Sequence, residues 1–92
     1  VKVYKQVFIP NAFTPNGDRV NDTWNIPALA ALKNFELIVY NRYGQKVFYL
    51  KNENRSWDGT FEGQDQPSGV YTYVIYADRF INPMKGTVMI IR

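Results

Sequence analysis

The sequence predicts an all-β fold, an antiparallel β-sandwich of about seven strands. The first observation is composition: 46% of the 92 residues are hydrophobic and 16% are aromatic, a mixture that favours strands in a folded chain. The second is that turn-forming Gly, Pro, Asn and Asp residues recur at short intervals. These turn signals are Pro15-Asn16-Gly17-Asp18, Asn41-Arg42-Tyr43-Gly44, Asp58-Gly59, Glu62-Gly63, Pro67-Ser68-Gly69 and Asn82-Pro83.

Between the turns lie short segments rich in Val, Ile, Tyr, Phe and Thr, which is the pattern of strands. The segments predicted as strands are 3–9, 23–26, 35–41, 45–50, 70–78 and 86–92. Only 27–34 has a helical composition, with Pro27 at a first position that a helix tolerates. A piece this short is marginal as a helix, so we expect one or two turns that cross between the sheets.

The strand patterns indicate which faces are buried. Phe35, Leu37 and Val39 alternate with more polar residues, so we expect them to face the core. Segment 70–77 is apolar on both faces, which predicts a central strand covered on both sides and paired with 86–92.

The predicted sandwich is immunoglobulin-like and has an apolar core. Its members are Phe8, Phe13, Trp24, Phe35, Leu37, Val39, Val47, Trp57, Tyr71, Tyr73, Ile75, Val88 and Ile90. The chain has no internal repeat and no linker-like segment, so residues 1–92 are predicted to form a single domain. Because the chain begins at Val1 without Met, we expect it to be cut from a longer secreted protein.

Composition argues against several classes of function. Without Cys and His the chain lacks disulfides, thiolate nucleophiles, the commonest general base and the commonest transition-metal ligand. The net charge of +3 comes from scattered basic residues, so we expect no nucleic-acid binding. No segment approaches the roughly 18 apolar residues of a membrane span, so we expect no membrane insertion. Paired carboxylates among Asp18, Asp22 and Asp58 do not have diagnostic spacing for glycosidase chemistry. We therefore expect no catalytic residues and no enzyme.

The loop from Asn16 to Asp22 is dense in Asn and Asp, and it allows two interpretations. Asn16, Asp18 and Asp22 could supply oxygen ligands to Ca²⁺, although Arg19 adds a positive charge there. Alternatively, these side chains accept hydrogen bonds from their own backbone in Asx-turns, which requires no metal. Apart from this possible Ca²⁺, the sequence predicts no cofactor.

Two further motifs stand out. Trp57-Asp58-Gly59-Thr60 predicts a tight turn in which Gly59 has a positive φ and Trp57 covers one end of the core. The alternative for Trp57 is that its ring stacks on a ligand. The hairpin with its turn centred on Arg42 to Gly44 has a basic and aromatic tip, a chemistry that is common at partner contacts. The residues of this tip are Arg42, Tyr43, Lys46 and Tyr49. A solvated tip without function is the alternative.

Taken in order along the chain, these motifs resemble the type B C-terminal sorting domain of type IX secretion, also called the gliding motility-associated C-terminal domain, of Bacteroidota. The segments that carry the resemblance are 8–18 with Asn21, Asp22 and Trp24, then 39–48, 57–60, 67–71 and 85–92. The chain departs from the family pattern at Arg19, where Gly is usual, and at Tyr43, where Trp is common.

The resemblance implies an export signal at the end of a large cell-surface protein. Such proteins cross the inner membrane by an N-terminal signal peptide and the outer membrane through the type IX translocon. The implied partners are the outer-membrane secretion machinery and cargo upstream in the same polypeptide, and the implied location is the cell surface or the extracellular space. We expect the domain itself to be a monomer.

We hypothesise that the machinery recognises a folded surface, with candidate recognition residues Arg42, Tyr43, Lys46, Lys85, Ile90, Ile91 and Arg92. The terminal strand, residues 87–92, could offer a free edge to which a partner adds a strand, or it could be an ordinary core strand. A different class of function is also open: an immunoglobulin-like cell-surface adhesion module, stabilised by Ca²⁺ in the loop from Asn16 to Asp22.

Overall fold

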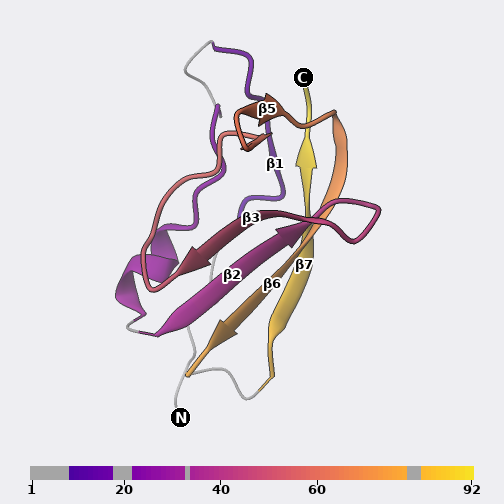
Figure 1. Cartoon of the computed structure of the whole chain (residues 1–92). Helices are drawn as coiled ribbons and strands as arrows, with labels where there is room; N and C mark the ends of the chain where they lie inside the picture. The colour runs from indigo at the N-terminus through magenta and orange to yellow at the C-terminus, as the bar shows by residue number, and fades with distance from the viewer. Residues whose placement is uncertain (1–8, 18–21, 33, 79–81) are drawn as a thin grey trace.

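The computed structural model describes residues 9–17, 22–32, 34–78 and 82–92, and within them the fold is almost entirely β (Figure 1). The strands are β1 (Ala12–Phe13), β2 (Phe35–Tyr40), β3 (Lys46–Lys51), β4 (Thr60–Phe61), β5 (Gln64–Asp65), β6 (Gly69–Ala77) and β7 (Met84–Ile90). One 3₁₀ helix, η1 (Pro27–Ala31), interrupts them. The predicted all-β, sandwich-like class is confirmed.

Five strands form the main sheet in the order β1-β7-β6-β2-β3. The pairs β2–β3, β2–β6 and β6–β7 are antiparallel, and the predicted pairing of 70–78 with 86–92 is confirmed. β1 pairs with β7 in parallel, which departs from a wholly antiparallel sandwich. β1 and β7 are far apart in the sequence, so no tight hairpin forces them to run in opposite directions.

A second, less regular layer covers one face of this sheet. It contains the β4–β5 hairpin, η1 and a pair of hydrogen bonds between Trp24 and Trp57. The backbone N–H of Trp24 donates to the Trp57 carbonyl at 2.7 Å, and the backbone N–H of Trp57 donates to the Trp24 carbonyl at 2.9 Å. The predicted strand 23–26 is therefore reduced to a single bridge, and the predicted helical segment 27–34 to five residues of 3₁₀ helix.

The core lies between the two layers, and Phe35, Leu37 and Val39 face it as predicted. Every predicted core residue that the structure describes is buried, while Phe8, with the predicted strand 3–9 up to that residue, lies outside the described residues. The structure adds Ile26, Leu29, Leu50 and two residues of the opposite sheet face, Ile38 and Val74.

The prediction that 70–77 is covered on both faces is wrong for β6. Tyr71, Tyr73 and Ile75 point into the core, but Val70 and Tyr76 are 51% and 46% exposed. The second face of β6 is open to solvent there although it carries apolar residues, because an antiparallel sheet can have one face on the core and the other in water.

Tyr73 and Gly86 show how β6 and β7 fit together. They are direct neighbours in the register, and a Cβ atom at position 86 would overlap the Tyr73 ring. The absence of a side chain at Gly86 lets this ring lie across β7, where it also packs 5.4 Å from the Trp24 ring.

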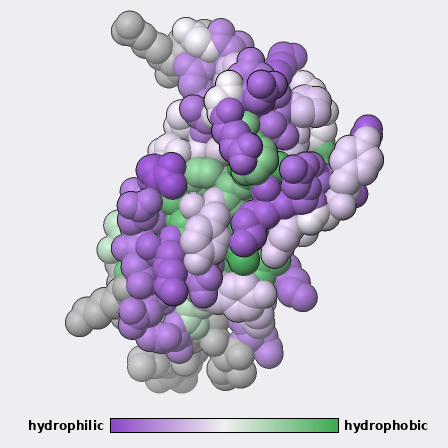
Figure 2. Space-filling view, in the orientation of Figure 1, coloured by the Kyte–Doolittle hydropathy of each residue, from purple (hydrophilic) through white to green (hydrophobic). Residues whose placement is uncertain are grey.

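The surface combines polar and apolar regions. Figure 2 shows hydrophobic surface near the middle of the face turned to the viewer, with hydrophilic side chains around it. No helical segment in the part of the chain that the structure describes is both long and apolar enough to cross a membrane.

Candidate functional site

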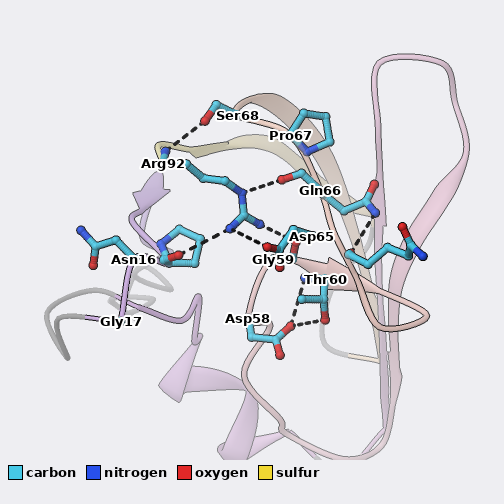
Figure 3. Close-up of polar contacts among 12 residues, drawn as sticks. Asn16, Gly17, Asp58, Gly59, Thr60, Asp65, Gln66, Pro67, Ser68 and Arg92 are labelled. Atoms are coloured by element: carbon cyan, nitrogen blue, oxygen red, sulfur yellow. Dashed lines mark hydrogen bonds and ion pairs between the residues drawn. The ribbon is translucent and has the colours of Figure 1, made fainter.

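The last residue of the chain, Arg92, ties together three turns at one end of the sheet (Figure 3). Its guanidinium group donates from Nε to the Gln66 carbonyl at 2.7 Å, from Nη2 to the Gly59 carbonyl at 2.9 Å and from Nη1 to the Pro15 carbonyl at 3.4 Å. Its backbone N–H donates to Ser68 Oγ at 3.0 Å. We name the group Pro15, Gly59, Gln66, Ser68 and Arg92 the C-terminal pole.

Strand pairing brings Arg92 to this position. The Met89 N–H donates to the Asn11 carbonyl at 2.9 Å and the Ile91 N–H donates to the Phe13 carbonyl at 3.0 Å, so β1 lies along the end of β7. The terminal strand is therefore not a free edge from Met89 to Ile91, because β1 and β6 occupy its two sides. Of the two alternatives for the terminal strand, the structure shows the ordinary core strand over that segment and not the open edge.

Gly59 lets the guanidinium group approach the backbone. Its φ of +83° lies in the left-handed region, and an added Cβ would lie 3.0 Å from Arg92 Nη2 and 3.3 Å from Pro15 Cγ. A side chain at position 59 would therefore meet both an unfavourable backbone conformation and the side chain of Arg92. The predicted positive φ at Gly59 is confirmed.

The turn that presents Gly59 is held by Asp58 and Thr60. Asp58 Oδ1 accepts hydrogen bonds from Thr60 Oγ1 at 2.6 Å and from the Thr60 N–H at 3.0 Å. The Thr60 hydroxyl lowers the pKa of Asp58 most, with smaller contributions from backbone hydrogen bonds and the charge of Arg92, while partial burial opposes them. Asp58 thus acts as an ionised acceptor that shapes the turn.

Trp57 connects the turn of the pole to the core. It is 1% exposed, its indole N–H donates to the Thr60 carbonyl at 2.9 Å, and its ring packs against Phe13, Phe48 and Tyr71. The prediction that Trp57 covers one end of the core is confirmed, because the side chain is buried against these rings. A side chain this buried offers no ring face to a ligand.

The loop with the predicted Ca²⁺ ligands uses one of them to order its backbone. Asp22 Oδ1 accepts hydrogen bonds from the Gly17 N–H at 3.0 Å and from the Asn16 N–H at 3.2 Å. Asp22 thus bonds to the backbone of its own loop, but at residues five and six positions earlier in the chain rather than in an Asx-turn, which joins residues two apart. Asp18 lies outside the described residues, within which no group of three or more acidic, His or Cys residues could hold a metal. The Ca²⁺ site stays a prediction.

The hairpin tip, which we define as Asn41 to Gln45, is built from its own residues, and the predicted hairpin is confirmed. Asn41 Oδ1 accepts from the N–H groups of Tyr43 and Gln45, both at 2.9 Å. Arg42 donates to the Tyr43 hydroxyl at 2.8 Å and its guanidinium carbon lies 5.0 Å from the centre of that ring. Tyr43 is 78% exposed, so the tip presents an aromatic ring and a cation to solvent.

The structure separates the remaining candidate recognition residues. Lys46 lies beside the tip with its ammonium 4.9 Å from the centre of the Tyr49 ring. Lys85 is exposed on β7, where it pairs with Val74 of β6. Ile90 is 1% exposed and belongs to the core, and Ile91 is 47% exposed next to the pole. The set thus does not form one patch.

Sequence reasoning singled out Arg92 but missed its partners. The Pro15, Gly59 and Gln66 carbonyls carry no side-chain signal in a sequence. The available signal was indirect: Pro15, Gly59 and Ser68 lie within the turn motifs that carry the family resemblance, and Gln66 lies just before one.

Comparison with known proteins places this geometry in a family context. The family model described as CHU_C type IX secretion signal domain matches residues 7–90. That segment includes the three turns that Arg92 contacts. No curated protein matches the chain.

Proposed function

The chain belongs to the type IX secretion signal domain family, and we propose that it directs a large cargo through the type IX translocon across the outer membrane to the cell surface. A signal of this family implies export toward the cell surface or the extracellular space. The family is not one of enzymes, and the proposal assigns any chemistry to cargo upstream in the same polypeptide.

The observation that carries the proposal is the family match over residues 7–90. The fold supports it further, because the motifs of the resemblance meet in space at the C-terminal pole. Pro15 follows β1, Gly59 precedes β4, and Gln66 follows β5. A surface of this kind exists only after the whole domain has folded.

We propose that the outer-membrane machinery recognises a folded surface of the domain rather than a linear C-terminal peptide. The N–H groups of Met89, Ile91 and Arg92 are all hydrogen-bonded within the domain. A receptor that required an extended free peptide would have to break these bonds. Of the candidate recognition residues, Ile90 is buried in the core, and the exposed ones are Arg42, Tyr43, Lys46, Lys85, Ile91 and Arg92.

The test is surface delivery of a fluorescent reporter that carries a signal peptide and residues 1–92. We expect surface fluorescence in cells with a functional type IX system and periplasmic retention in cells without the translocon. A reporter lacking residues 1–92 should be retained in both strains. Retention of the folded domain in both strains would contradict the proposal and favour the adhesion-module interpretation.

A further inference from the structure

Most of the large hydrophobic side chains that are exposed in the described part of the chain lie on one face of the main sheet. Strand residues alternate between faces, so Val70 and Tyr76 of β6 point away from the core. The register places Met89 beside Val70, and Tyr49 beside Ile38. We name this side of the sheet the outer face. Its exposed members and their exposed fractions are Val70 51%, Tyr76 46%, Met89 42% and Tyr49 37%.

The centre of the outer face is apolar and closely packed. Ile38 and Val74 are direct neighbours in the register, and each is only 9% exposed. They belong to adjacent strands, and Tyr49 follows on the next strand. An antiparallel sheet usually turns polar residues toward water, and a contiguous apolar region with a polar rim marks a protein contact.

The charged residues of the outer face are mostly basic. Lys51 and Tyr76 both pair with Glu36, and Lys85 pairs with Val74, which places these lysines on opposite sides of the apolar centre. Lys46 lies above the Tyr49 ring. The Glu36 carboxylate already accepts a hydrogen bond from the Tyr49 hydroxyl at 2.7 Å.

We infer that the outer face binds a protein of the secretion machinery through an apolar patch bordered by Asp or Glu side chains. The exposed apolar side chains around the centre, which are Val70, Tyr76, Met89 and Tyr49, supply contact area. The three lysines, Lys46, Lys51 and Lys85, select a partner with carboxylates around its own apolar surface. This inference rests on the proposed function and adds the surface through which the domain is recognised.

The experiment uses the reporter with residues 1–92 and exchanges single exposed charges. Lys85→Glu and Lys51→Glu should each lower surface delivery about tenfold, because they place like charges at the contact. Arg55→Glu is the matched control, since Arg55 is exposed, pairs with Glu53 and lies over the Phe48 ring, away from the outer face. It should change delivery less than about twofold. Circular dichroism and thermal unfolding must show that each variant is folded.

Val70→Asp tests the apolar part of the proposed contact. It places a carboxylate among the exposed apolar side chains of the outer face and should also lower surface delivery of the reporter. If the unsubstituted domain is delivered only by type IX-competent cells and all three outer-face variants match it, the inference is wrong and the proposed function stands. If the unsubstituted domain is retained, the proposed function itself fails. A concentration-dependent dimer seen by sedimentation, lost in Val70→Asp while delivery is unchanged, would assign the face to a second copy and overturn the inference.

Discussion

The C-terminal pole and the hairpin tip each contain an arginine. The hydrogen-bond partners of Arg92 at the pole are distant in the sequence, whereas the partner of Arg42 at the tip is adjacent. Arg92 bonds to groups that lie 24 to 77 residues away in the chain, whereas Arg42 bonds to its neighbour, Tyr43. Burial raises the pKa of Tyr71, and the positive charges of Arg92 and Arg42, which lie near the same end of the sheet, oppose this shift. The tip can form from local turn chemistry, while the pole requires the whole chain to fold. Recognition at the pole would thus report complete folding, and recognition at the tip would not.

The largest contrast should come from the aromatic residues of the two regions. Trp57→Ala removes a buried ring that supports the pole, and we expect it to lower the free energy of unfolding by about 3 to 5 kcal/mol. Tyr43→Ala removes an exposed ring at the tip, and we expect a change within about 0.5 kcal/mol. Urea unfolding of both variants measures the difference. Equal losses would remove the distinction between the two regions.

The glycines give a sharper comparison, because both adopt a left-handed backbone. Gly44 at the tip has φ +79° with open space around it, whereas Gly59 has φ +83° and faces Arg92. We expect Gly44→Ala to cost about 1 kcal/mol from the backbone alone, and Gly59→Ala about 2 kcal/mol because the methyl group also meets the guanidinium. Thermal and urea unfolding provide the measurement. A Gly59→Ala variant no less stable than Gly44→Ala would show that the guanidinium moves away at no cost.

Removal of the two arginine side chains should have smaller effects. Arg92→Ala removes the guanidinium donor from three main-chain carbonyls, of which that of Gly59 still accepts from the Gln66 N–H. The Arg92 side chain is 26% exposed, and we expect a loss of about 1 to 2 kcal/mol. Arg42→Ala should cost less than about 0.5 kcal/mol. Arg92→Lys should restore only part of the stability, since an ammonium lacks the planar fork of donors.

A double-mutant cycle separates the pole contact from other effects. If Gly59→Ala acts through Arg92, the loss in the double variant with Arg92→Ala will be smaller than the two single losses combined. Additive losses would mean that the two residues act independently, despite the 2.9 Å hydrogen bond between them.

The smallest expected effect is confined to acid pH. The pKa of Asp58 lies below its usual range, so its carboxylate favours the folded state above the unfolded pKa of about 4, and this contribution is lost as pH falls through the folded pKa. Thr60→Val removes the donor that lowers this pKa most, and we expect the Asp58 pKa to rise. Carbon-detected NMR titration of the Asp58 carboxyl group measures it. An unchanged pKa in Thr60→Val would contradict the assigned cause.

Local patterns in the sequence were enough to predict much of this molecule. Alternation placed Phe35, Leu37 and Val39 in the core, and the composition of 41–45 predicted the hairpin. These predictions held because side-chain burial with period two and turn chemistry are properties of a few neighbouring residues. The order of the motifs also identified the family, since it depends only on residue types along the chain.

Tertiary structure decided the features that depend on which distant segments meet. The parallel pairing of β1 with β7, and the carbonyl groups that Arg92 contacts, arise from segments at opposite ends of the chain. Likewise, an apolar residue such as Val70 could be buried or exposed. Val70 is exposed because the second layer packs on the other side of the sheet. Main-chain acceptors and the solvent exposure of a sheet face have no signature in residue type. The sequence alone therefore determined the family and the four long strands, β2, β3, β6 and β7, whereas the folded chain determined the short strands, the pole and the outer face.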